Sequence, residues 1–111
     1  MQNKIAKDLQ DHLGLTDDDV RPAIMGETGV DLKLMSEEAR RKVGLAIECK
    51  SQEKLNIWSA LDQASENASA LEPAVVFTRN RSLTYVAIKW DHLLTILKKL
   101  NCITDVSDVQ K

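Results

Sequence analysis

The sequence predicts an α/β domain in which helices flank a central mixed β-sheet. Segments with apolar residues three and four positions apart alternate with short segments that are either continuously apolar or alternately apolar and polar. The resulting order is helix, two or three strands, helix, two strands and helix, an order typical of α/β domains. With 111 residues and 43% hydrophobic content, we expect one domain over residues 1–111, with its core at about 20–90 and a tail at 101–111.

The first third of the chain is predicted to contain one helix and up to two strands. Residues 3–13 place apolar side chains at helical spacing and end at Gly14, a residue that commonly terminates helices. Residues 16–29 are acidic and interrupted by proline and glycine, which predicts a loop with a short edge strand at 22–25. Residues 30–35 alternate between apolar and polar side chains and are predicted to form a half-buried strand.

The remaining elements follow from the same two patterns. Ser36 and Asp91 are predicted N-terminal caps, and the middle helix has an apolar stripe made mostly of alanine, which allows close approach to a sheet. Trp58 and Trp90 are expected to pack in the core or at its edge, with contact to a base or to another subunit as the alternative. The predicted elements are a capped turn at 36–42, a strand at 43–50, a helix at 55–71, strands at 74–78 and 83–90, and a helix at 91–100.

Charge is unevenly distributed along the chain, although the net charge is only −2. The first 38 residues contain nine acidic and four basic residues, whereas the rest contains eight acidic and eleven basic residues. Basic side chains can contact phosphates locally even in an acidic protein, although scattered Lys and Arg more commonly form a solvated surface. The candidates for phosphate contacts are Arg40, Arg41, Lys54, Arg79 and Arg81.

The cysteine content and the hydropathy indicate a cytoplasmic protein with no membrane partner. Cys49 and Cys102 lack the CxxC spacing and the neighbouring histidines of a zinc site. No signal peptide is recognisable, so a secreted disulfide scaffold is not expected either. No apolar run approaches the ~20 residues that a transmembrane helix requires.

The stretch GLAIECK ends a buried strand with an acid and a base on one side. Side chains alternate along a strand, so Leu45, Ile47 and Cys49 are expected on the core face. Glu48 and Lys50 then share the opposite face. The simplest interpretation is an ion pair at the end of a strand.

A second acid, Asp31, lies on the preceding predicted strand and can project from the same sheet face at one edge. Two carboxylates that converge beside Lys50 repel each other unless a divalent cation lies between them. Carboxylate oxygens with few soft ligands nearby suit Mg²⁺ or Mn²⁺. Lys50 could then orient water or stabilise a developing phosphoryl charge, which is the alternative to a surface ion pair.

The segments GVDLKL and ECK, followed by a helix that carries Gln63, resemble the PD-(D/E)XK nuclease superfamily. The resemblance covers the order of elements over most of the chain and implies a restriction endonuclease-like core. In that superfamily the motif Asp lies on one strand, the ExK motif lies on the next, and a Gln on the following helix often supports the site. Asp31, Glu48, Lys50 and Gln63 match these positions, while Val30 stands where the family has proline.

The run IECKSQEKLNIWSALDQASENA resembles small phage-encoded endonucleases of this superfamily, and GETG resembles the flexible substrate loop of Holliday junction resolvases. These resemblances imply that Glu27 is an auxiliary acid near the metal and that Asp8, or else Asp11, is an acid supplied by the first helix. They also imply that Cys49 offers its backbone carbonyl to the metal. The alternatives are an ordinary turn for Glu27 and a solvated helix face for Asp8.

The resemblance implies a Mg²⁺-dependent endodeoxyribonuclease, with Mn²⁺ as a substitute. Asp31 and Glu48 would ligate the metal. Lys50 would orient the attacking water or stabilise the pentavalent charge, and Gln63 would position Lys50 or the substrate. The expected substrate is branched or junction DNA in phage DNA metabolism, the expected assembly is a homodimer, and the expected compartment is the cytoplasm of a bacterial host. A non-specific or nicking endonuclease is an alternative, and a non-catalytic DNA-binding or assembly subunit is an alternative of another class.

Overall fold

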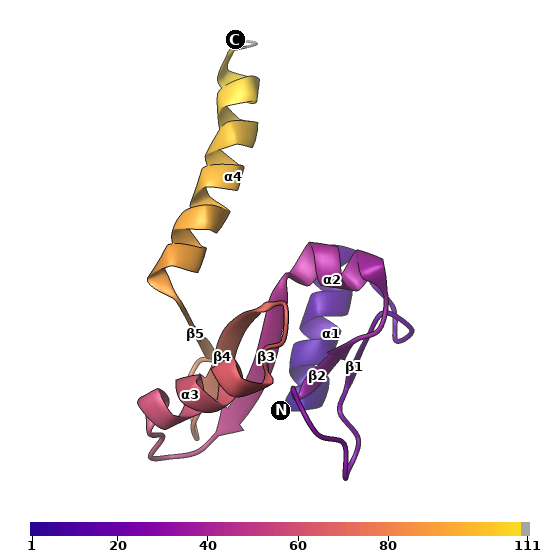
Figure 1. Cartoon of the computed structure of the whole chain (residues 1–111), viewed down its shortest axis with the longest axis vertical. Helices are drawn as coiled ribbons and strands as arrows, with labels where there is room; N and C mark the ends of the chain where they lie inside the picture. Colours follow the sequence, from indigo (N-terminus) through magenta and orange to yellow (C-terminus); the bar gives the residue numbers. More distant parts are fainter. Residues whose placement is uncertain (110–111) are drawn as a thin grey trace.

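A computed structural model of the chain describes the backbone of residues 1–109 and the side chains of residues 1–102. Most elements gather around a small sheet, and the last helix projects away from them (Figure 1). The elements are α1 (Gln2–Leu13), β1 (Val20–Pro22), β2 (Leu32–Leu34), α2 (Glu37–Val43), β3 (Leu45–Ser51), α3 (Ile57–Asn67), β4 (Glu72–Thr78), β5 (Tyr85–Ile88) and α4 (Trp90–Val109).

The strands form a three-stranded mixed sheet and a separate two-stranded sheet, which confirms the predicted α/β class. Strand β3 runs parallel to β4 through the crossover helix α3, and β5 runs antiparallel to β4. Strands β1 and β2 pair antiparallel, with Val20 opposite Leu34. The two sheets meet where the backbone N–H of Asp31 donates to the carbonyl oxygen of Ile47 at 3.1 Å. The residue just before β2 is therefore hydrogen-bonded to the open edge of β3.

Each face of the three-stranded sheet has its own apolar cluster. On one face, side chains of β3 and β4 pack with α1, α2 and the two-stranded sheet, and Cys49 packs against this cluster as predicted. On the other face, Ala60 and Ala64 of α3 pack against Val75 of β4. Because alanine is small, α3 lies close to the face of β3 that carries Glu48. The first cluster consists of Ile5, Ala6, Leu15, Val20, Leu32, Ala39, Ile47, Ala74 and Val76.

Two helix ends follow the predicted capping chemistry. Gly14 ends α1 with a positive φ of 66°, a conformation that glycine adopts without strain. The hydroxyl of Ser36 accepts from the backbone N–H of Ala39 at 3.0 Å, so the predicted turn is the capped helix α2. This cap joins α2 to the end of β2.

Several predicted boundaries are wrong. The predicted edge strand at 22–25 lies two residues earlier in the chain, at Val20–Pro22. The strand includes Val20 because the side chain of that residue is fully buried in the core. Asp91 does not cap α4, because that helix already begins at Trp90. The helix also continues to Val109 and takes up most of the predicted tail, since no glycine or proline follows Leu100 to end it.

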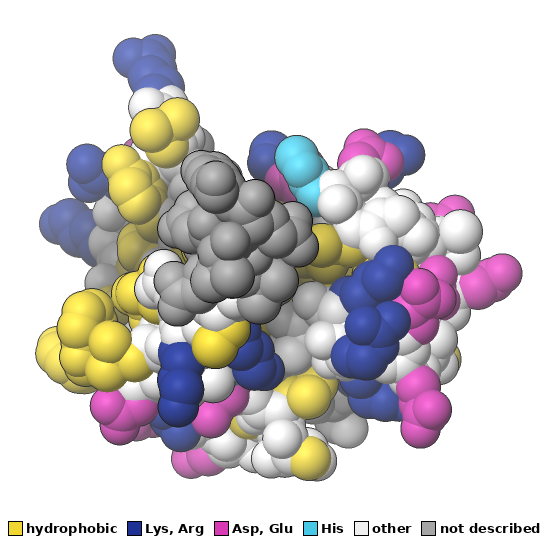
Figure 2. All heavy atoms as spheres, turned by 90° about the horizontal axis from the view of Figure 1, so that it is seen from above, with side chains coloured by type: hydrophobic (Ala, Val, Ile, Leu, Met, Phe, Trp, Pro, Cys, Tyr) yellow, Lys and Arg dark blue, Asp and Glu magenta, His cyan; other side chains and the backbone are white. Residues whose placement is uncertain are grey.

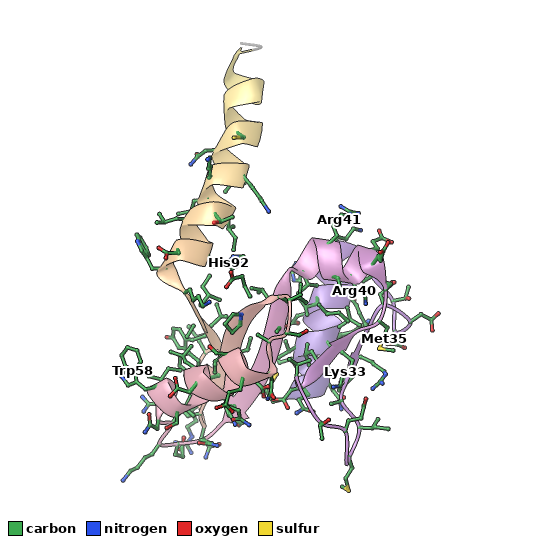
Figure 3. The ribbon with its side chains drawn as sticks, viewed as in Figure 1. Lys33, Met35, Arg40, Arg41, Trp58 and His92 are labelled. Atoms are coloured by element: carbon green, nitrogen blue, oxygen red, sulfur yellow. The ribbon has the colours of Figure 1, made fainter. Side chains whose placement is uncertain are left out.

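The two tryptophans are not packed, contrary to prediction. Trp58 is 76% exposed and Trp90 is 66% exposed. Trp58 lies about 160° around α3 from Ala60 and about 120° from Ala64, at 100° per residue, so it points away from the sheet. Figure 3 shows it at the far end of α3. Trp90 begins the projecting helix and is exposed for that reason.

Candidate functional site

Asp31 is held against the edge of β3 by both its backbone and its side chain. Its N–H donates to Ile47, and its Oδ2 accepts from the backbone N–H of Cys49 at 2.7 Å. These two bonds occupy the edge of β3 that would otherwise be open. They also fix the carboxylate beside the middle of β3, where Glu48 lies.

Glu48 is a buried acid, with only 2% of its surface exposed. The Nδ2 of Asn67 donates to its Oε1 at 2.8 Å. Burial raises the pKa of Glu48, and the charge and hydrogen bond of Asp31 raise that pKa further, while Asn67 and Lys50 act in the opposite direction. The structure therefore brings Asp31 and Glu48 together, as the sequence predicted.

Lys50 lies on the same face of β3, two residues beyond Glu48. Its Nζ donates to Oε1 of Gln63 on α3 at 2.7 Å, which is the contact that the sequence predicted. No described carboxylate forms an ion pair with Lys50 within 4.0 Å. The ammonium group is held in place by a neutral partner and keeps its charge available.

Cys49 does not have the properties of a nucleophile. Its side chain lies on the core side of β3, and burial raises the pKa of its thiol to about 12, with further increases from the charges of Asp31 and Glu48. A thiol with so high a pKa forms almost no thiolate at neutral pH. Only the backbone of Cys49 is available to the acid pair.

The acid pair fits a hard divalent cation better than a soft metal. Among the described residues, no three His, Cys, Asp or Glu side chains form a group that could hold a metal. The pair offers two carboxylates, and neither has an ion-pair partner among the described side chains. Mg²⁺ is commonly held by one or two carboxylates together with substrate phosphates and water, so a two-acid site is sufficient for it.

Asn67 is a residue of this site that the sequence analysis did not identify. It lies four residues after Gln63, on the same side of α3. Gln63 and Asn67 face Lys50 and Glu48, which are two residues apart on β3. Two amide side chains four residues apart on a helix face an acid and a base two residues apart on a strand. This pattern would have identified Asn67.

Glu27 does not join the acid pair. Arg21 holds its carboxylate with distances of 2.8 and 3.2 Å, and the backbone N–H of Ile24 donates to it at 2.8 Å. The bond with Arg21 is the main reason that the pKa of Glu27 falls to about 2. In this arrangement Glu27 closes the loop between β1 and β2.

Asp8 also lies apart from the acid pair, in an ion pair with Lys4 at 2.8 Å on the exposed face of α1. The part of the N-terminal segment that lies near β3 is instead Met1, Gln2 and Asn3. These residues line a shallow hollow together with Cys49 and Ser51. Asp8 follows Asn3 by five residues, or about 7.5 Å along a helix. The part of α1 near β3 is therefore its first turn.

The predicted phosphate-binding residues fall into two groups. Arg40 and Arg41 lie on α2, and Figure 3 shows them at the opposite side of the molecule from Trp58. Arg40 donates to the carbonyl oxygen of Leu34 at 3.1 Å. The second group consists of Lys54 in the loop after β3 and of Arg79 and Arg81 in the loop after β4.

Two adjoining hollows, of about 450 and 630 Å³, lie where the loops after β3 and β4 meet. Lys54, Arg79 and the half-exposed Tyr85 line both hollows, and Arg81 lines the second. None of the three cations forms an ion pair with a described side chain. Glu53 also lines both hollows, and its Oε2 accepts from the backbone N–H of Asn80 at 3.0 Å. The hollows therefore combine three unpaired cations and one carboxylate with an aromatic ring, and the excess of positive charge beside a ring suits a nucleic-acid strand.

Comparison of the chain with protein-family models, curated proteins and solved structures finds no match. None of the helices that the structure describes combines the length and the apolarity needed to cross a bilayer. A functional interpretation therefore depends on the geometry of the acid pair and of the basic hollows.

Proposed function

We propose that this protein is a metal-dependent DNA endonuclease of the PD-(D/E)XK type, with a restriction endonuclease-like core. The observation that carries the proposal is the convergence of Asp31 and Glu48 beside Lys50. Two unneutralised acids at one sheet edge destabilise the protein by mutual repulsion, and a functional site is a common reason for keeping such a pair.

Asp31, Glu48 and the backbone carbonyl of Cys49 would hold Mg²⁺, with Mn²⁺ as a substitute. When bound, the cation supplies a Lewis acid that neutralises charge on a phosphodiester and lowers the pKa of water. The bond from Cys49 N–H fixes the orientation of the Asp31 carboxylate, and Asn67 fixes that of Glu48. The donor set is thus preorganised by the strand and by α3.

Lys50 is the residue proposed to act on the reacting phosphate. Its Nζ, anchored by Gln63, donates a hydrogen bond to water or to a phosphate oxygen as negative charge develops there. Water adds its oxygen to phosphorus, one ester P–O bond breaks, and the products are a phosphate end and a hydroxyl end. Gln63 is a positioning residue in this scheme, because it acts through Lys50.

The basic hollows are proposed to guide one DNA strand to the acid pair. Lys54 follows Lys50 by four residues, so the two side chains are anchored no more than roughly 14 Å apart. That distance spans about four nucleotide steps of a B-form strand. Arg79 and Arg81 would contact the backbone beyond Lys54, and Tyr85 offers a face on which a base can stack.

We expect branched or junction DNA as the preferred substrate, in phage DNA metabolism, and a homodimer as the active form. The chain has few unpaired cations for tight binding of a straight duplex, and two protomers would double that number. Branched DNA brings two backbones to two sites without the energy needed to bend a stiff duplex. A non-specific or nicking activity would need only one protomer.

The test is cleavage of linear, nicked, flapped and four-way DNA by the purified protein, with Mg²⁺ and with EDTA. Mg²⁺-dependent cleavage that is fastest on the four-way substrate supports the proposal in full. Equal cleavage of all substrates supports a non-specific nuclease, and single-strand breaks alone support a nicking enzyme. DNA binding without cleavage under any metal condition would overturn the enzymatic proposal in favour of a non-catalytic subunit.

A further inference from the structure

Helix α4 has an apolar face on which the described side chains of Leu94, Ile96 and Leu97 remain partly exposed. Figure 1 shows it running away from the sheet and from the other helices. Between Trp90 and Leu100, its apolar side chains occupy about 160° of the circumference at 100° per residue, and its polar side chains occupy the rest. Leu94, Ile96 and Leu97 on the apolar side are 45%, 40% and 39% exposed. A helix with this pattern normally packs its apolar face against another element.

Strand β5, which leads into α4, is an unprotected edge. Its Tyr85–Ile88 segment pairs with β4 on one side and with no described strand on the other. The segment contains neither charge nor proline, the residues that usually prevent edge strands from pairing. The opposite edge of the sheet, at β3, is occupied by the hydrogen bonds of Asp31. The sheet can therefore be extended on the β5 side.

These two features form one continuous region, which we call the β5–α4 surface. Hydrophobic side chains gather beside α4 when the molecule is viewed along that helix (Figure 2). At roughly 100 Å² for each half-exposed large side chain, the surface offers about 500 Å² of apolar area toward the ~800 Å² that each partner buries in a stable complex, and pairing of the β5 edges would add backbone to it. Its members are 39–66% exposed and comprise Val86, Trp90, Leu94, Ile96 and Leu97.

The charge of the β5–α4 surface favours a second copy of the chain over DNA. A two-fold interface brings like against like, so a charged surface would repel its own copy. No charged residue lies between Leu83 and Ile88, and the neighbouring Lys89 is already paired with Glu72 at 3.5 Å. Lys98 and Lys99 lie on the polar side of α4.

We propose that the β5–α4 surface is the interface of a homodimer, in which the β5 strands of two copies pair antiparallel and α4 of each copy packs on its partner. Antiparallel pairing about a two-fold axis would join two three-stranded sheets into one of six strands. The β5–α4 surface is the interface that the homodimer of the proposed function would use. The evidence for it is apolar exposure and a strand edge with no described partner, not nuclease activity. Its test accordingly requires neither DNA nor metal.

The test is the molar mass of the full chain in solution by sedimentation equilibrium at micromolar concentrations. The wild type should be a dimer, and Val86→Lys and Leu97→Lys should each weaken the dimer by at least about tenfold, the effect of 1.4 kcal/mol. Trp58→Lys is the control, because Trp58 is more exposed than Val86 or Leu97, at 76% against 55% and 39%, but lies on α3. Circular dichroism of each variant should match the wild type.

A monomeric wild type, or a dimer that both lysine variants leave unchanged, would overturn the inference. A monomer that sediments with anionic lipid vesicles would overturn it in favour of a membrane surface. Asp31→Asn should remain a dimer while it loses cleavage. An inactive dimer would thus contradict the nuclease activity alone, and an active monomer would contradict the interface and the expected dimeric form but not the nuclease activity.

Discussion

The acid site and the β5–α4 surface differ in what one chain supplies to each. At the acid site, β3 and the end of α3 provide a partner for Asp31, Glu48 and Lys50 from within the same chain. At the β5–α4 surface, large apolar side chains and the edge of a strand have no described partner. The comparison indicates that one chain supplies the geometry of the acid site, whereas the β5–α4 surface would be covered by a second copy in the proposed dimer.

If this separation holds, changes in the acid site should abolish chemistry and leave assembly intact. Glu48→Gln keeps an oxygen that accepts from Asn67 but removes the charge that would hold the cation. We expect cleavage to fall by roughly 1,000-fold, or about 4 kcal/mol of transition-state stabilisation. The rate is measured on a labelled four-way junction, with Glu66→Gln, an exposed position on α3, as the control. Unchanged cleavage, or loss of the dimer, would contradict the separation.

Lys50→Met should give the next largest effect. The methionine keeps the aliphatic part of the side chain and removes the ammonium that Gln63 positions. We expect kcat to fall by roughly 100-fold with little change in KM, because a donor to developing charge acts mainly in the transition state. Lys7→Met, which removes an exposed ammonium on α1, is the matched control. A rise in KM alone would assign Lys50 to substrate binding.

Two substitutions of Asp31 should separate its structural role from its chemical role. Asp31→Ala leaves the Cys49 N–H without its acceptor and should reduce the free energy of unfolding by about 1–3 kcal/mol. Asp31→Asn retains an acceptor oxygen and relieves the repulsion with Glu48, so its stability in EDTA should equal or exceed that of the wild type. Urea unfolding measures both. Equal stability of the two variants would mean that the bond to β3 contributes little.

The smallest effect is a pH dependence of stability in the absence of metal. The folded pKa of Glu48 lies above its unfolded value of about 4.3, so the folded state binds this proton more tightly. The resulting stability is present below that unfolded value and is lost as the pH rises through the folded pKa. The Tm of Glu48→Gln minus that of the wild type should therefore grow as the pH rises above about 4.3. A constant difference would show that Glu48 titrates normally.

Local patterns predicted the parts of the fold and of the site that depend on neighbouring residues. Strand alternation alone placed Glu48 and Lys50 on one face and Cys49 on the other, because the side-chain period of a strand is two. Apolar spacing predicted the helices and the mixed sheet. Gln63 was predicted from the resemblance to the PD-(D/E)XK superfamily rather than from a local pattern, and it lies on the helix that packs on the face of β3 that carries Lys50.

The wrong or missing predictions are of two kinds. Some depend on which partner a polar side chain binds, and others depend on which element packs against an apolar face. The sequence gives no way to know that Arg21, six residues away, holds the carboxylate of Glu27, because that contact depends on the loop conformation. The hydrogen bond from the Cys49 N–H to Asp31 forms because β3 is an edge strand, and the sequence does not specify which strand lies at the edge. An amphipathic pattern predicts that one side of a helix is buried but not by what, so the exposure of Trp90 was not foreseen.

The central claim, that the acid pair carries the reaction, is tested most directly by one ratio of rates. Asp31→Asn and Asp62→Asn each replace one carboxylate by an amide, but Asp62 is exposed on α3 and belongs to no described hydrogen bond or ion pair. We predict that Asp62→Asn cleaves a four-way junction in Mg²⁺ at the wild-type rate and that Asp31→Asn is at least about 1,000-fold slower. Equal rates for the two folded, dimeric variants would contradict the account.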